Sequence, residues 1–213
     1  MINELLGTIP PAFILIFGAL LIALTKGHVK KIISIALPVI CLIYIHNLTE
    51  LSIYSVNFLG HELSLLRADT LAKVFGYIFT LSLAAAFIYG YSTNRKSEII
   101  SGLMYVGAAL GVVFAGDIIS LYLYWELMAI TSVFLILLRN TTKSKSAATR
   151  YIIVHIVGGL VLLAGVLIQI QTTGNISFTS FTDINAGTIL ILIGFLVNAA
   201  AIPDKEFRRL TTT

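Results

Sequence analysis

Charged residues are scarce in this sequence. They make up only 11% of the 213 residues, whereas hydrophobic residues make up 58%, and the mean hydropathy is +0.97. Soluble globular domains carry about 25% charged and about 45–50% apolar residues. The scarcity of charge excludes a water-soluble domain and predicts an all-α integral membrane protein.

Cysteine and the motifs of soluble enzymes are also lacking. Cys41 is the single cysteine, so the chain has no internal disulfide, and its apolar surroundings predict a small packed residue. We find no Walker motif, dinucleotide fingerprint, metal-ligand cluster or nucleophile elbow. We therefore expect no cofactor, no bound metal and no catalysis by the chain alone. The formal charge of +4 calls for no nucleic-acid partner, because the basic residues lie in short gaps between apolar runs.

Long apolar runs dominate what is present. Each approaches the roughly 20 residues that cross a bilayer. Pro10 and Pro11 open the first run, where a missing N–H group is tolerated. Residues 51–69 are too polar to span, and their alternation around "LGHE" predicts a small hairpin on the membrane surface. The seven predicted transmembrane helices cover residues 9–25, 32–48, 70–91, 99–116, 118–138, 151–171 and 186–203.

Basic residues give these helices an orientation. All but two of the 14 lie in alternate gaps; the exceptions are Arg67 and Lys73. By the positive-inside rule, the basic gaps are cytoplasmic, so the N-terminus is predicted outside and the C-terminus in the cytoplasm. The most basic gap, residues 139–150, is predicted to be a solvated cytoplasmic loop.

One acidic residue stands apart from this pattern. Glu126, in "LYLYWELMAI", is the only one of the ten acidic residues well inside a predicted span, roughly 12 Å below the outer surface. A charge there costs about 2.5–3.5 kcal/mol on insertion scales. A carboxyl group in hydrocarbon favours its neutral form, so it can hold and release a proton near neutral pH. Two interpretations stay open: a proton-handling site, or a protonated side chain that bonds a neighbouring helix. Tyr122, Tyr124 and Trp125 beside it predict an aromatic belt at the outer interface.

Two further polar residues are weaker candidates for an ion path. His155 lies four residues into the sixth predicted helix and is followed one turn later by Gly158 and Gly159, which allow close helix approach. An interfacial or hydrogen-bonded histidine is the alternative. Asn198, deep in the seventh helix, fits an interhelical hydrogen bond equally well. Glu126, Asn198 and His155 are expected roughly 12, 18 and 23 Å below the outer surface, as a proton relay would require if their helices are neighbours.

The same segments carry a family resemblance. Residues 107–137, "GAALGVVFAGDIISLYLYWELMAITSVFLIL", resemble the fourth and fifth helices of the antiporter-like proton-pumping family. This family includes the large membrane subunits of complex I and the D and A subunits of Mrp-type cation/proton antiporters. The motif W-E-L-M is the most specific part. "LLRADTLAKVFGYIF", "RYIIVHIVGGLVLLAG" and "LIGFLVNAAAIP" are similar to the family's third, sixth and seventh helices, and the Mrp D-subunit branch is the most similar.

The resemblance implies site residues and a domain plan. It makes Glu126 a key residue of the proton path, which in the family is typically coupled to a lysine on the seventh helix. Asn198 stands at that position in this chain, so the lysine charge is missing. Family members are about twice as long and contain two inverted repeats. The expected parts are residues 1–97 with helices one to three and an outer hairpin, residues 98–203 as a partial proton-antiporter domain with an incomplete repeat, and residues 204–213 as a polar cytoplasmic tail.

The function that follows is the N-terminal portion of a Na+/proton antiporter or proton-translocating subunit, truncated or split, in a bacterial inner membrane. Expected partners are other membrane subunits of an antiporter or NADH:quinone oxidoreductase-like complex, among them a separate chain with the missing C-terminal half. The lipid bilayer is the remaining partner, and nucleic acid is not one. The alternatives are a membrane assembly or scaffold protein and a non-functional remnant of such a subunit.

Overall fold

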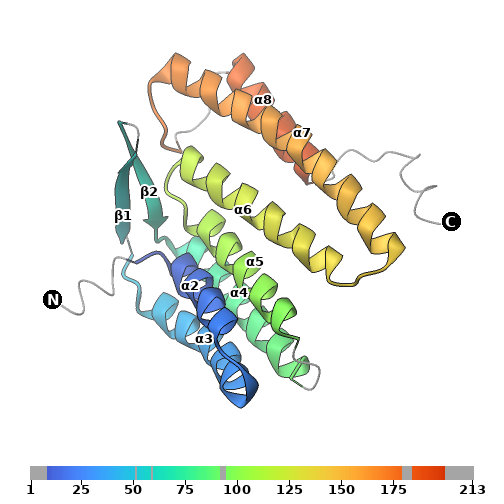
Figure 1. Ribbon diagram of the computed structural model, residues 1–213. Coiled ribbons are helices and arrows are strands. Elements are labelled where there is room, and N and C mark those ends of the chain that lie inside the picture. Colours follow the sequence, from blue (N-terminus) through green and yellow to red (C-terminus); the bar gives the residue numbers. More distant parts are fainter. Residues whose placement is uncertain (1–8, 51, 59, 92–94, 179–183, 200–213) are drawn as a thin grey trace. The chain divides into compact units, whose positions relative to one another are not determined.

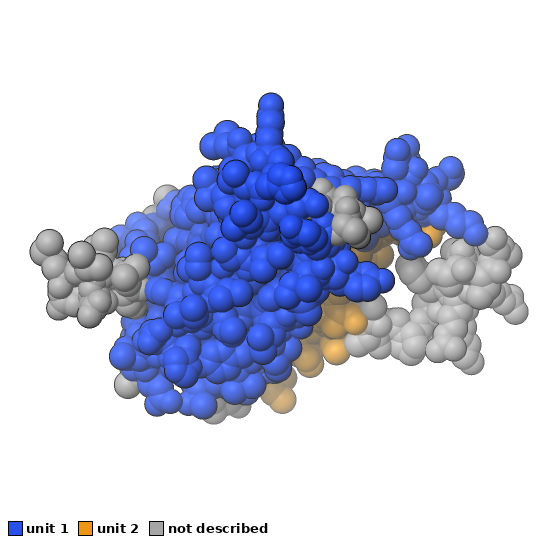
Figure 2. Space-filling model, turned by 90° about the horizontal axis from the view of Figure 1, so that it is seen from below, with its two compact units in different colours: residues 1–145 blue, residues 146–213 orange. Residues whose placement is uncertain are grey.

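The chain forms two compact units, residues 1–145 and residues 146–213 (Figure 2). The described residues contain seven helices and one two-stranded sheet (Figure 1). The computed structural model describes residues 9–50, 52–58, 60–91, 95–178 and 184–199.

Five helices build the first unit around α5. This helix contacts α2, α4 and α6 as well as strand β2. The core between the helices is made of interlocking aliphatic and aromatic side chains, among which Leu15, Leu110 and Phe114 are fully buried. Cys41 is part of this core, as predicted. The helices are α2 (Pro11–Leu24), α3 (Gly27–Asn47), α4 (Thr70–Tyr89), α5 (Lys96–Phe114) and α6 (Ile118–Leu137).

Helix starts follow local chemistry in the sequence. Helix α2 begins at the predicted proline pair, with Pro10 as its N-cap. Helix α4 begins after Asp69, whose Oδ1 accepts from the Ala72 N–H at 2.8 Å. An aspartate at this position satisfies an N–H group that lacks a partner inside the helix.

The predicted hairpin is confirmed. Strands β1 (Ile53–Phe58) and β2 (His61–Arg67) pair antiparallel. Gly60 in the turn has φ 84°, a left-handed conformation that glycine adopts without strain. The Gly116 N–H donates to the Ser64 carbonyl at 2.8 Å, so β2 is fixed to the connection between α5 and α6. Its position on the membrane surface stays a prediction.

In the second unit, most of α7 (Thr142–Thr173) packs against α8 (Ala186–Asn198) at very short range. A Cβ added at Gly194 would lie 2.7 Å from the Leu162 backbone nitrogen. One added at Gly165 would lie 2.6 Å from the Ile191 backbone nitrogen. The two helices therefore meet backbone to backbone at glycines, a packing typical of membrane helices.

The seven predicted apolar helices are confirmed within the described residues. Five of them, α3 to α7, have the length and apolarity of a membrane span. Helices α2 and α8 are apolar but shorter, with 14 and 13 described residues, and the predicted end of the last helix at residues 200–203 lies outside the described part. The inside and outside assignment of the termini and the sequence-based domain boundaries remain predictions.

The prediction of a loop over residues 139–150 is wrong. Helix α7 already begins at Thr142, directly after a reciprocal cap in which Thr141 and Ser144 exchange backbone-to-side-chain hydrogen bonds of 3.0 Å. Polar composition favoured a loop, but the cap and the following alanines favour a helix. At 32 residues, α7 is about 48 Å long, more than the roughly 30 Å of the hydrocarbon layer. Part of α7 must therefore extend beyond that layer.

Candidate proton-translocation site

Glu126 lies within α6, as predicted, and is the one carboxyl or basic side chain of that helix. The aliphatic hydroxyl groups that follow it in α6 bond to backbone carbonyls of the same helix. Thr131 donates to the Leu127 and Met128 carbonyls at 3.0 and 2.9 Å. Ser132 donates to the Ala129 carbonyl at 2.7 Å. These bonds within the helix leave Glu126 as the group in α6 that can exchange a proton near neutral pH.

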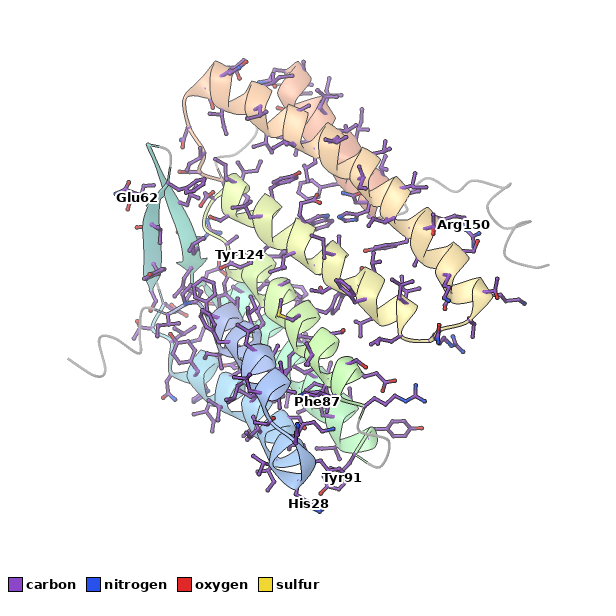
Figure 3. All side chains as sticks on the ribbon, viewed as in Figure 1. His28, Glu62, Phe87, Tyr91, Tyr124 and Arg150 are labelled. Atoms are coloured by element: carbon purple, nitrogen blue, oxygen red, sulfur yellow. The ribbon has the colours of Figure 1, made fainter. Side chains whose placement is uncertain are left out.

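The orientation of Glu126 follows from its neighbour Tyr124. The ring of Tyr124 covers Gly111 of α5, where an added Cβ would lie 2.2 Å from the ring (Figure 3). Tyr124 is 7% exposed and belongs to the core, so its assignment to an aromatic belt is wrong. Successive helical residues turn by about 100°. Glu126 follows Tyr124 by two residues and is therefore turned about 200° around the helix, to the side of α6 that faces away from α5. Its Oε1 atom is buried.

Asp117 fixes the height of Glu126 in the first unit. Its Oδ1 accepts from the Ser120 N–H at 2.8 Å, and its Oδ2 accepts from the Ser120 hydroxyl at 2.6 Å. The same Oδ2 accepts from the Ser64 N–H of β2 at 2.6 Å. The carboxylate thus caps α6 and ties it to the hairpin, about 13.5 Å along the helix from Glu126.

His155 lies on α7 and is 7% exposed. Its ring stacks on Tyr151, one turn earlier, with centroids 5.7 Å apart and an interplanar angle of 20°. Because α7 begins at Thr142, His155 is well inside the helix rather than four residues from its start. An imidazole ring can donate a hydrogen bond through one nitrogen and accept one through the other.

Asn198 comes close to His155 in the second unit. A Cβ added at Gly158 would lie 2.1 Å from the Asn198 Oδ1, so the amide occupies the space that this glycine leaves open. Gly158 is one turn along α7 from His155. The structure therefore brings His155 and Asn198 together, while Glu126 belongs to the first unit.

Gln169 is a polar residue of the same helix pair that sequence reasoning missed. It lies 14 residues after His155, about four helical turns, and so on the same side of α7. A Cβ added at Gly187 of α8 would lie 2.9 Å from the Gln169 backbone nitrogen. The 14-residue spacing from His155 was the signal available in the sequence. His155, Gln169 and Asn198 form what we call the polar seam between α7 and α8.

Two members of the polar seam have unmet hydrogen-bonding capacity. Among the described residues, neither amide atom of Asn198 nor the Oε1 of Gln169 has a protein partner, although these atoms are buried. Buried polar atoms in proteins are usually paired with protein groups or ordered water. Within the described ranges, no cluster of three His, Cys, Asp or Glu side chains is placed to hold a metal ion. The seam therefore offers buried donors and acceptors to water molecules.

Comparison with known proteins places this site in context. Residues 115–205 match the family "NADH:quinone oxidoreductase/Mrp antiporter, TM". The matched segment contains Glu126, His155, Gln169 and Asn198. A sequence relative, antiporter subunit mnhD2 of Staphylococcus epidermidis, is 28% identical over 168 residues, which are 75% of this chain and 32% of the relative. The chain thus spans about a third of the length of the curated relatives it matches.

Solved structures share the fold. A chain of the Mrp complex from Dietzia sp. DQ12-45-1b is 24% identical with a TM-score of 0.72, covering 93% of this chain and 23% of that one. A chain of respiratory complex I from Thermus thermophilus is 16% identical with a TM-score of 0.75, covering 89% and 42%. At these identities the likeness establishes the fold. The chain is thus similar in sequence to an antiporter subunit and shares its fold with chains of an Mrp complex and of complex I.

Proposed function

We propose that this chain is the N-terminal portion of a monovalent cation/proton antiporter or proton-translocating subunit, with Na+ as the expected cation. The observation that carries the proposal is the carboxyl group of Glu126 on an apolar helix, inside the segment that matches the antiporter family. Ionisable groups in membrane spans are costly and usually mark ion or proton pathways.

Glu126 is the proposed proton carrier. Its helix offers no second carboxyl or basic group, and the side chain faces away from the core that holds α5 and α6 together. A carboxyl group at that position contributes little to the packing of the first unit. Its cost in the membrane is better explained by proton uptake and release.

The polar seam is the proposed second part of the path. His155 supplies an ionisable ring, and the amides of Asn198 and Gln169 offer donors and acceptors to water molecules. Asn198 takes the position of the family lysine, so it orients water without adding a charge. In our proposal, His155, one turn away, is the group of the seam that changes its charge.

The setting of the chain follows from the same relationship. We infer a bacterial inner membrane location, with the N-terminus outside, and an assembly with other membrane subunits. The relatives named above are an antiporter subunit and chains of Mrp and complex I assemblies. The chain covers about a third of the curated relatives. In this proposal, the remaining length of such a subunit completes the antiporter, and residues 98–203 are its partial antiporter domain.

The test is cation-driven proton flux in membrane vesicles that contain the complete complex. Glu126→Gln keeps the shape of the side chain but removes the exchangeable proton, so flux should fall by at least tenfold, typical of the loss of a proton-transfer group. Glu98→Gln is the matched control, because Glu98 pairs with Arg95 at 3.4 Å at the start of α5, outside the proposed path. It should leave the flux unchanged.

A structural role for Glu126 predicts a different pair of results. A scaffold protein would show unchanged flux in Glu126→Gln, together with reduced recovery of the assembled complex. Quantifying the assembled complex by native electrophoresis beside each flux measurement separates the two roles. Unchanged flux with normal assembly contradicts the proposed proton carrier.

A further inference from the structure

An open apolar groove runs along the surface of α3 in the first unit, beginning at Lys31. Its floor and walls are Ile32, Ile35, Ala36, Val39 and Ile40, and Lys31 and Tyr91 close one end. The spacing of these α3 residues puts them on one side of the helix. Ile32, Val39 and Ile40 are 67%, 43% and 52% exposed, so no described segment of the chain covers the groove.

The closed end of the groove is built for a negative charge beside an apolar chain. The Lys31 ammonium lies 4.5 Å from the centre of the Tyr91 ring, a cation–π contact that holds the charge at the mouth of the groove. Tyr91 follows α4, and Figure 3 shows it at the same end of the first unit as His28. A cation and an aromatic hydroxyl at one end of an aliphatic strip match the polarity profile of a phospholipid.

Two of the other basic groups near this end bind elsewhere. The Lys96 ammonium donates to the Ala23 carbonyl at the end of α2, and Arg95 pairs with Glu98 at 3.4 Å. Residues 26–31 and 95–98 together contain five lysines and arginines and one acid. Their excess positive charge attracts anionic lipid, and among them the ammonium of Lys31 lines the groove.

We propose that the α3 groove is a binding site for an anionic phospholipid, with one acyl chain on the strip from Ile32 to Ile40 and the headgroup phosphate at Lys31 and Tyr91. The strip is about 12 Å long, enough for a large part of an acyl chain. This site is separate from the proton path and does not depend on it.

The test uses the full chain, reconstituted in bilayers of equal parts phosphatidylcholine and phosphatidylglycerol. The protein is then extracted together with the lipids that stay bound, and native mass spectrometry identifies these lipids by their mass. Wild-type protein should retain phosphatidylglycerol preferentially. Lys31→Gln should lower the ratio of bound phosphatidylglycerol to phosphatidylcholine about fivefold, the effect of one basic residue at an anionic surface. The control Lys26→Gln removes the same charge from an exposed lysine outside the groove and should change the ratio much less.

A second variant tests the groove itself. Ala36→Phe fills the strip without removing charge and should reduce retention of phosphatidylglycerol, while circular dichroism shows unchanged helix content. Equal effects of Lys26→Gln and Lys31→Gln would overturn the site in favour of diffuse attraction. Unchanged retention in Ala36→Phe would also overturn it, as would a photo-crosslinker at Val39 that captures a protein subunit rather than phospholipid in native membranes.

Discussion

The two units solve the problem of helix packing in opposite ways. In the first, α5 and its neighbours interlock through large buried side chains such as Leu103, Leu110 and Phe114. In the second, α7 and α8 meet at glycines, with backbone atoms in place of side chains. Lipid tails solvate apolar side chains as well as a protein core does, so both arrangements depend on close contact rather than on escape from water. Large side chains make a stable frame, whereas glycines leave room for buried amides.

The two kinds of packing match two different roles in the proposed site. The first unit fixes α6 through α5, the hairpin and Asp117, and so holds Glu126 at a defined height. The second unit places His155, Gln169 and Asn198 in one seam where close helix contact is possible. We therefore expect the second unit to be most sensitive to enlarged glycines and the core of the first unit to be sensitive to truncated side chains. The expected loss of unfolding free energy falls from about 3 kcal/mol at a glycine contact to about zero at Gln169.

Gly194→Ala should be the most damaging change. The added Cβ would lie 2.7 Å from the Leu162 nitrogen, and because backbone cannot move aside, α7 and α8 must separate, at a cost of about 3 kcal/mol. Gly102→Ala in α5 is the matched control. Its Cβ would lie 3.4 Å from the Phe87 ring, an ordinary contact, so a small gain in stability is expected. Denaturant unfolding in micelles, followed by circular dichroism, measures both, and equal losses would contradict the contrast between the units.

Phe114→Ala makes a side chain smaller, whereas Gly194→Ala makes one larger. Phe114 is fully buried, and its truncation leaves a cavity in the first unit. The loss should be about 2 kcal/mol, below the range for water-soluble cores, because lipid also solvates the phenylalanine side chain when the helices come apart. Leu167→Ala on the exposed side of α7 should cost less than about 0.5 kcal/mol. A similar loss in both variants would mean that the first unit has no side-chain core of its own.

Asp117→Ala removes the cap of α6 and its bond to β2. The expected loss is about 1 kcal/mol, the usual value of an N-cap. Asp117→Asn should retain most of the stability, because asparagine is also a good N-cap. Hydrogen exchange of the Ser64 and Ser120 amides reports the change directly. If Asp117→Ala leaves both amides protected, the link between hairpin and α6 does not depend on this carboxylate.

Gln169→Leu should barely affect stability, so it tests whether a residue of the polar seam acts on proton flux alone. The buried Oε1 has no partner among the described residues, so an apolar side chain of similar size should be neutral or slightly stabilising. Proton flux in the complete complex should nevertheless fall several-fold, because the seam loses a group that holds water. A loss of stability above about 1 kcal/mol, without a change in flux, would make Gln169 a structural residue.

Apolar runs and turn chemistry were sufficient to predict much of the fold. Local sequence patterns, each made by neighbouring residues, predicted the seven helices, the hairpin at residues 53–67 and the start of α2 at its prolines. The start of α7 could not be predicted in this way. The capping pair of Thr141 and Ser144 begins a helix in a segment whose polar composition favours a loop. Local caps of this kind carry little weight in a hydropathy profile.

The site was only partly predictable for a related reason. Glu126 stood out because a carboxyl group inside an apolar run is costly. The burial of Tyr124 depends on Gly111, and the position of Asn198 depends on Gly158, each on a different helix. Such contacts between distant segments leave no periodic signal in one sequence. Gln169 shares a helix side with His155, but only the packing of α8 shows that this side is an interior one.

The central claim is that Glu126 takes up and releases a proton inside the membrane. Infrared difference spectroscopy of the full chain in bilayers, recorded while the pH is changed, measures this directly through the C=O stretch of a protonated carboxyl group. We predict a band that appears as the pH is lowered through the neutral range, where water-exposed carboxyl groups stay ionised, and that persists in Glu98→Gln and is absent in Glu126→Gln. A band that persists unchanged in Glu126→Gln, or the lack of any pH-dependent band in the wild-type chain, would contradict the claim.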